Sequence, residues 1–184
     1  MSTRISNANP LPRAGSLPDT HLVADLLAPG LRLVFCGTAL GRVSAERRAY
    51  YANPTNFFWR TLHRVGLTPD LLKPEEFPKL LEYGIGLTDL CKTAYGNDAE
   101  LPEQAFDVES LKEKLRRYQP GILAFTSKTG AAAFLGERVT ARIAYGEQKT
   151  TLDKTRLFVL PSPSGQARTY WDESWWRRLA ESLN

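Results

Sequence analysis

The stretch LRLVFC, residues 31–36, decides the fold class of this chain. It is an apolar run with one charged residue near its start, and the glycine-bounded segment GTALG, residues 37–41, follows it at once. A continuous apolar run of this length is typical of a strand that is buried on both faces, as the strands of parallel sheets are. The stretch therefore predicts a parallel β-sheet that helices cover on both sides.

Similar runs lie downstream and are separated by segments with helical signals. GILAFTS (121–127) and RLFVL (156–160) predict buried strands, and IGLTDL (85–90) predicts a short extended segment or a loop. LVADLL (22–27) predicts a short amphipathic segment. The polar residues 137–154 are compatible with either a hairpin or a surface loop. Helices are expected to begin at Asn53-Pro54, Pro74, Asp107, Lys128 and about Asp172. We expect an α/β fold, a three-layer α/β/α sandwich with a small central parallel sheet.

The overall composition is that of an ordinary globular protein. The chain has 184 residues, of which 42% are hydrophobic and 24% are charged. We expect residues 1–18 to be a flexible N-terminal arm and residues 19–184 to form a single domain. No apolar run reaches the roughly 18 residues that span a bilayer, and the N-terminus lacks the apolar segment of a secretory signal. We therefore expect a cytoplasmic protein with no membrane partner and, by default, a monomer.

The sequence offers little for a metal or a cofactor. The only cysteines are Cys36 and Cys91, too few for an iron–sulfur cluster with four thiolate ligands. No Cys-x-x-Cys or His-x-x-x-His spacing occurs, so we expect neither a metal nor a cofactor. The net charge of +4 is compatible with a polyanionic partner but does not by itself indicate one.

Two loops follow predicted strands at their carboxyl ends, where parallel sheets bind ligands. GTALG follows residue 36, and PSPSG (161–165) follows residue 160. GTALG is not followed by the Gly-Lys-Ser/Thr of a P-loop and lacks the Gly-x-Gly-x-x-Gly spacing of a dinucleotide site. Its glycines alone favour a tight connection between a strand and a helix.

The wider pattern resembles the uracil-DNA glycosylase superfamily, and most closely its mismatch-specific uracil/thymine-DNA glycosylase branch, with an atypical first motif. The segments that carry the resemblance cover most of residues 24–178 in the family's order: LLAPGLRLVFCG, GTALG, YYANPTNFFW, GIGLTDL, YQPGILAF and LPSPSG. The resemblance implies an enzyme that flips a damaged base out of DNA and hydrolyses its N-glycosidic bond.

The resemblance also implies roles for the first loop and the residues after it. Thr38 and the backbone of Ala39 are expected to meet the negative charge that develops on the departing base. Tyr51 matches the aromatic residue that stacks on that base, although it could instead pack in the core. The predicted substrate-binding residues are Gly37, Gly41, Ser44, Tyr51 and Asn56.

The second loop matches the DNA-facing loop of the family. Ser162 stands where the main branch has Asn, and we count it among the catalytic candidates. Ser164 and the Gly165 N–H are expected to contact phosphate, and Gln166 stands at the position of the wedge that fills the hole left by the base. Arg168 is expected to pair with a phosphate, unless it is only a solvated surface charge.

The pattern departs from the family at Ala39, where the mismatch-specific branch carries Asn and other branches carry Asp. Alanine cannot position a water molecule, so two interpretations follow. In one, Asp89 orients water and stabilises an oxocarbenium-like sugar, with Asn56 and His63 as weaker candidates. In the other, catalysis relies on stabilisation of the leaving base alone, and Asp89 is a cap or an ion-pair partner.

These residues predict a monofunctional uracil-DNA glycosylase whose partner is DNA containing uracil or another deaminated base. No lysine occurs in either loop, so Schiff-base lyase chemistry is not expected. Three alternatives stay open: a catalytically dead sensor of flipped bases or abasic sites, a glycosylase for another base such as hypoxanthine, and an enzyme that processes small nucleotides.

Overall fold

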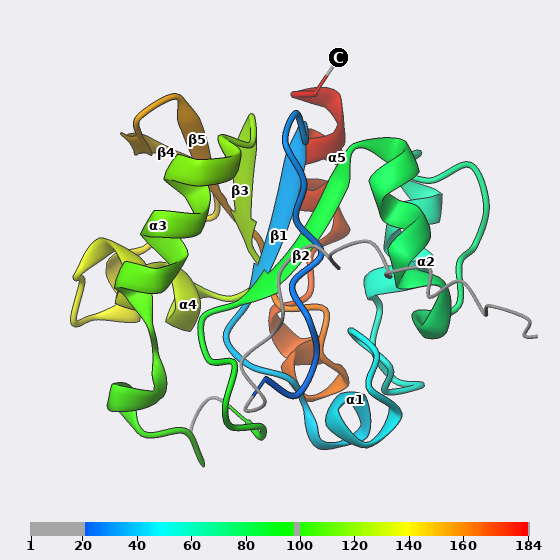
Figure 1. The fold of residues 1–184 in the computed structure, drawn as a ribbon, viewed down its shortest axis with the longest axis horizontal. Coiled ribbons are helices and arrows are strands. Elements are labelled where there is room, and N and C mark those ends of the chain that lie inside the picture. Colours follow the sequence, from blue (N-terminus) through cyan, green and yellow to red (C-terminus); the bar gives the residue numbers. More distant parts are fainter. Residues whose placement is uncertain (1–20, 98–99, 184) are drawn as a thin grey trace, which may run out of the picture.

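A computed structural model describes residues 21–97 and 100–183, so the arm predicted over residues 1–18 lies outside the described part. Five strands form one sheet in the order β2-β1-β3-β5-β4 (Figure 1). The strands are β1 Leu33–Gly37, β2 Ile85–Asp89, β3 Ile122–Phe125, β4 Gly146–Leu152 and β5 Thr155–Val159. Strands β2, β1, β3 and β5 run parallel to one another, whereas β4 pairs antiparallel with β5 at the edge.

Helices connect the strands and cover the sheet. The α-helices are α1 Arg42–Arg47, α2 Phe58–Arg64, α3 Val108–Tyr118, α4 Lys128–Leu135 and α5 Glu173–Glu181. The 3-10 helices are η1 Pro74–Tyr83, η3 Glu103–Ala105, η4 Thr140–Arg142 and η5 Gly165–Tyr170. In Figure 1, α3 and α4 lie on one side of the sheet and α2 and α5 on the other.

Each face of the sheet has its own hydrophobic core, because successive strand residues point to opposite faces. Leu33 and Phe35 of β1 pack with residues of α2 and α5. Val34 and Cys36 of the same strand pack with residues of α3 and α4. The layered α/β sandwich expected from the sequence is thus confirmed, with an antiparallel edge strand added to the parallel part.

Several helical boundaries differ from those expected. The helix predicted from Asn53-Pro54 begins only at Phe58, because the Asn53 side chain accepts a hydrogen bond from the Thr55 N–H and closes a turn instead. The helix predicted from Pro74 is a 3-10 helix, and Pro78 inside it lacks the N–H that an α-helix needs.

Two other segments also take defined form. The segment 22–27 is not helical, and Leu26 forms an antiparallel bridge with Leu87 of β2. Within residues 137–154, β4 forms a hairpin with β5, which settles the choice between a hairpin and a loop in favour of the hairpin.

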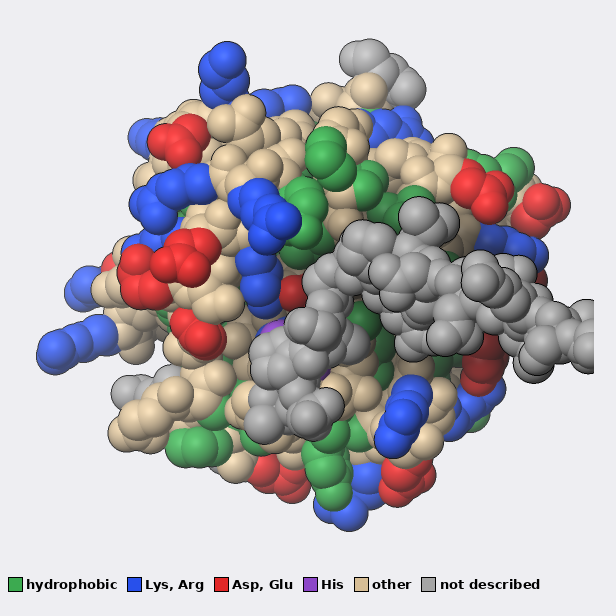
Figure 2. Space-filling model, viewed as in Figure 1, with side chains coloured by type: hydrophobic (Ala, Val, Ile, Leu, Met, Phe, Trp, Pro, Cys, Tyr) green, Lys and Arg blue, Asp and Glu red, His purple; other side chains and the backbone are tan. Residues whose placement is uncertain are grey.

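Surface charge and helix length give two general observations. On the face shown in Figure 2, the coloured basic and acidic side chains over α3 are interspersed and do not form a continuous basic patch. Within residues 21–97 and 100–183, every helix is too short or too polar to cross a lipid bilayer.

Candidate active site

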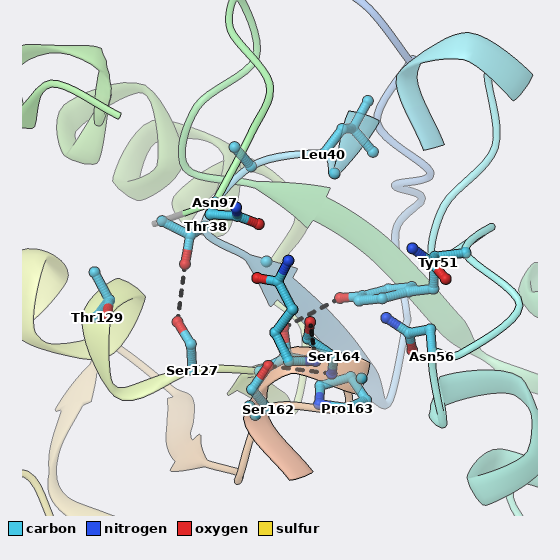
Figure 3. Close-up of a pocket in the computed structure, with 18 of the residues that line it drawn as sticks. Thr38, Leu40, Tyr51, Asn56, Asn97, Ser127, Thr129, Ser162, Pro163 and Ser164 are labelled. Atoms are coloured by element: carbon cyan, nitrogen blue, oxygen red, sulfur yellow. Dashed lines mark hydrogen bonds between the residues drawn. The ribbon is translucent and has the colours of Figure 1, made fainter. Parts of the chain in front are cut away.

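The carboxyl ends of the parallel strands lie at one edge of the sheet, where a cleft of about 1080 Å³ opens (Figure 3). Residues of the first loop (37–41) and of the second loop (161–165) both line this cleft. Apart from Arg168 and the weaker candidate His63, all predicted site residues line it: Gly37, Thr38, Ala39, Gly41, Ser44, Tyr51, Asn56, Asp89, Ser162, Ser164, Gly165 and Gln166. The structure therefore brings together two loops that are more than a hundred residues apart in the sequence.

Hydrogen bonds to neighbouring elements hold the first loop in place. The Cys91 N–H donates to the Thr38 carbonyl at 2.8 Å, and the Gly96 N–H donates to the Leu40 carbonyl at 2.9 Å. The Thr38 hydroxyl is 2.8 Å from the hydroxyl of Ser127, which in turn caps α4 (Figure 3). The backbone of the loop is thus fixed before any ligand arrives, which is the condition for electrostatic preorganisation.

Tyr51 forms an aromatic wall of the cleft. Its ring stacks on Phe58 with centroids 3.8 Å apart, and its hydroxyl is 3.3 Å from that of Thr126. The backbone at Tyr51 is left-handed, with φ at 52°, which is uncommon for a bulky residue and shows that the surrounding contacts impose the orientation. Burial raises the pKa of Tyr51 well above its usual value, and the nearby Asp89 adds to the effect, so the phenol is neutral.

Ser44 and Asn56 hold the segment that carries Tyr51. The Ser44 hydroxyl accepts a hydrogen bond from the Ala52 N–H at 3.0 Å, and the Asn56 side-chain oxygen accepts one from the Phe58 N–H at 2.9 Å. Both residues line the cleft, yet one polar atom of each side chain is already hydrogen-bonded to a nearby backbone N–H. Their arrangement fixes the turns on either side of Tyr51.

Asp89 is the last residue of β2 and lies opposite Gly37 of β1 in the sheet register. A side chain at position 37 would overlap the Asp89 Oδ1 atom, so the glycine makes the room that the carboxyl group occupies. Asp89 is only 4% exposed, and its Oδ2 atom has no hydrogen-bond partner among the described residues. Such an unpartnered buried oxygen is unusual in native proteins and often marks a functional group.

The surroundings of Asp89 disfavour its charged form. Burial raises the pKa of Asp89 from 3.8 to about 6, and the Lys92 ammonium, 3.7 Å from Oδ2, opposes this increase. The carboxyl group is therefore mainly ionised at pH 7 and protonated below pH 6. A buried carboxylate with this titration, beside a cleft, has the properties of a general base or a charge stabiliser.

The second loop is held by its own side chains and by the residue before α2. The Ser164 N–H donates to the Ser162 hydroxyl at 3.3 Å, and the Pro163 carbonyl accepts a hydrogen bond from the Phe57 N–H at 2.8 Å. Gln166 is exposed at the cleft. Arg168 lies outside the cleft lining, exposed, with its guanidinium 5.5 Å from the centre of the Phe57 ring.

The sequence analysis missed several residues that line the cleft. Thr126 and Ser127 follow β3 in the same way that the first loop follows β1, and both contribute hydroxyl groups. The polar pair at the end of GILAFTS was the available signal, because carboxyl ends of adjacent parallel strands meet at one edge. Asn97 and Glu100 also line the cleft, although no motif marked them.

Of the weaker candidates, His63 is exposed on α2 and does not line the cleft, whereas Asn56 does. Within residues 21–97 and 100–183, no three His, Cys, Asp or Glu side chains are grouped so as to hold a metal ion.

Comparisons with known proteins identify the family of the chain and a structure with a similar fold. A family model described as the Uracil DNA glycosylase superfamily matches residues 24–181. Among solved structures, the chain is similar to the solution NMR structure of a Methanosarcina acetivorans protein described as a "putative Uracil DNA glycosylase", with a TM-score of 0.61 and 22% sequence identity. The match covers 87% of this chain and 95% of that one. At this identity, the similarity to the solved structure concerns the fold.

Proposed function

Since the chain belongs to the uracil DNA glycosylase superfamily, we propose that it hydrolyses the N-glycosidic bond of uracil in DNA and leaves an abasic site. One observation carries this proposal. The cleft that the two loops share contains a buried carboxyl group, Asp89, whose Oδ1 atom lies beside Gly37 of the first loop. A nucleotide that is flipped out of a duplex into this cleft comes within reach of that oxygen.

Asp89 supplies the part of the chemistry that acts on the sugar. Cleavage breaks the bond between C1′ and the base, leaves the sugar oxocarbenium-like, and adds water at C1′. An ionised Asp89 accepts a hydrogen bond from that water through Oδ1, the oxygen beside Gly37, and stabilises the positive charge of the sugar. Its pKa of about 6 keeps it ionised at neutral pH and still basic enough to take a proton from the water.

The first loop and Tyr51 supply the part that acts on the base. The Tyr51 ring, backed by Phe58, offers a flat and neutral surface on which the base stacks. The backbone of Thr38 and Ala39, together with Ser162, lines the cleft where donors could meet the negative charge of the departing uracil. Because uracil leaves as an anion, donors of this kind lower the barrier to its departure.

The position of Asp89 accounts for the missing polar side chain at Ala39. Mismatch-specific relatives, which the first loop resembles, carry Asn at this position. Here the side chain at 39 is a methyl group, and the Asp89 carboxyl reaches the start of the same loop through the space left by Gly37. We infer that the water-positioning role has moved from the end of β1 to the end of the neighbouring strand β2.

The second loop is assigned to the DNA. We assign Ser164 and the Gly165 N–H, which line the cleft, to the phosphates beside the flipped nucleotide. The exposed Gln166 is assigned to the gap that this nucleotide leaves in the base stack. Arg168, outside the cleft, is assigned to a phosphate further along the strand.

The proposal is tested by incubating the protein with a labelled oligonucleotide that contains one uracil, followed by alkaline cleavage at abasic sites. Strand scission at the uracil in both the wild type and Asp172→Asn, together with at least tenfold less in Asp89→Asn, is the expected result. Asp172 caps α5 and does not line the cleft, so it controls for the chemical change alone.

Three other results would replace the proposal. Tight binding without scission would make the protein a sensor of flipped bases or abasic sites. Scission only at hypoxanthine in a matched oligonucleotide would move the activity to that base. Turnover of a free nucleotide, with none of the oligonucleotide, would indicate an enzyme that processes small nucleotides.

A further inference from the structure

A buried ion-pair network lies directly behind Asp89, away from the cleft. The Lys92 ammonium is 2.9 Å from Asp25 Oδ1 and 3.7 Å from Asp89 Oδ2, and it donates a hydrogen bond to the Tyr50 hydroxyl at 2.9 Å. On the other side of Asp25, the Lys114 ammonium is 2.7 Å from Oδ2. The network therefore joins two lysines and two aspartates, and only Asp89 among them lines the cleft.

We propose that Lys92 is the positioning residue for Asp89: its ammonium, anchored by Asp25 and Tyr50, keeps the Asp89 carboxyl group ionised in the space beside Gly37. This inference rests on the proposed function, because it assigns a residue that acts through Asp89. Lys92 is 8% exposed and lines a separate cavity of about 290 Å³, so it does not itself reach the substrate.

The anchoring of Lys92 matters because an ammonium that moved freely could form a close ion pair with Asp89. Tyr50 and Asp25 both lie within 2.9 Å of its nitrogen, whereas Asp89 lies at 3.7 Å. At the longer distance the lysine stabilises the negative charge from the side of Oδ2, while Oδ1 lies beside Gly37 on the side of the cleft. Asp25 is itself fixed by the Thr88 hydroxyl, which donates to Oδ1 at 2.8 Å.

Other charged and titratable groups also face Asp89. Asp25 from the segment before β1 raises its pKa, and Lys92 and Lys114 lower it. Cys36 of β1, Tyr50 and Tyr51 also lie in its surroundings, and burial keeps all three neutral. Loss of Lys92 and loss of the Asp25 charge should therefore change the titration of Asp89 in opposite directions, which no purely structural role would produce.

The test is an NMR titration of the Asp89 side-chain carboxyl carbon, assigned by its disappearance in Asp89→Asn. We expect Lys92→Met to raise the titration midpoint of Asp89 by at least about one pH unit and Asp25→Asn to lower it. Lys92→Arg retains the charge and should leave the midpoint closer to that of the wild type. Lys79→Met, which removes an exposed lysine paired with Glu76 on η1, is the control and should change nothing.

Excision rates then connect the titration to function. In Lys92→Met the single-turnover rate should fall on the order of fivefold at pH 6 and recover to within about twofold of wild type at pH 9. An unmoved Asp89 midpoint, midpoints that move the same way in Lys92→Met and Asp25→Asn, or a rate loss equal at both pH values would overturn the proposal. The titration needs no DNA, so the expected midpoints combined with no excision by the wild type would reject the glycosylase function and leave the Lys92–Asp89 coupling standing.

Discussion

Replacing Asp89 by asparagine should stabilise the protein while it impairs excision. Asp89→Asn keeps the shape of the side chain and removes a charge that the fold buries. In the folded protein the pKa of Asp89 is about 6, against an ordinary value of 3.8. A difference of about two pH units corresponds to about 3 kcal/mol, at roughly 1.4 kcal/mol per unit.

The sign of the effect follows from proton binding. The folded state binds the Asp89 proton more tightly than the unfolded chain does, so the stability of the wild type falls as the pH rises from about 4 to 6. Above pH 6 the full cost is present, and near pH 4 it has vanished. We therefore expect Asp89→Asn to be about 3 kcal/mol more stable than the wild type at pH 7.5 and equally stable near pH 4.

Thermal unfolding at the two pH values is the assay. For a chain of this size, about 3 kcal/mol corresponds to a rise in Tm of about 6–12 °C at pH 7.5. The single-turnover rate of uracil excision at the same pH should fall by at least about tenfold, or about 1.4 kcal/mol of barrier. The reasoning is that the buried, ionised Asp89 destabilises the folded protein. It would be refuted if the Tm of Asp89→Asn at pH 7.5 were equal to or lower than that of the wild type.

Three further substitutions test other parts of the site. Tyr51→Leu should reduce excision by roughly 5- to 150-fold, since stacking of a base on an aromatic ring is worth about 1–3 kcal/mol, whereas Tyr51→Phe should stay within about threefold of the wild type. Gly37→Ala should reduce single-turnover excision by at least about tenfold, because the added methyl group displaces the Asp89 carboxyl. Arg168→Ala should weaken DNA binding and reduce the slope of log K against log salt by about one.

Each of these variants has a result that would count against its assignment. An excision rate in Tyr51→Leu equal to that in Tyr51→Phe would remove the ring from base binding. A fully active Gly37→Ala would mean that the Asp89 carboxyl need not lie beside the first loop. For Arg168→Ala the comparison is Arg116→Ala, near the end of α3 that leads into β3; an equal slope in both variants would exclude a phosphate contact of Arg168.

Local patterns predicted most of the layered fold. The apolar runs around Val34, Leu123 and Leu157 became neighbouring parallel strands, because runs of this kind can be buried only when both faces are covered. Asp107 and Asp172 cap α3 and α5 as expected, since an N-cap depends only on the residues that follow it.

Predictions were wrong where two local signals competed. Asn53 and Asn56 can both begin a helix, and the earlier one closes a turn while the later one accepts the hydrogen bond from the Phe58 N–H. Glutamates, lysine and leucines favour an α-helix over residues 74–83, yet Pro78 within the segment leaves a 3-10 helix.

The candidate site was predicted in outline only, for a physical reason. The two loops could be placed together because strand ends in a parallel sheet share an edge. The contact of Lys92 with Asp25, in contrast, joins residues that no periodicity or motif relates. The raised pKa of Asp89 likewise depends on burial by several distant segments, which becomes visible only in three dimensions.

The most direct test of the whole account is a crystal structure of Asp89→Asn bound to a duplex that contains one uracil. The account predicts that the uracil lies in the cleft against Tyr51, with C1′ connected to the side chain at position 89 through a single water and hydrogen bonds of roughly 2.6–3.2 Å. A uracil that stays stacked in the duplex, or one that enters a different cavity far from position 89, would contradict it.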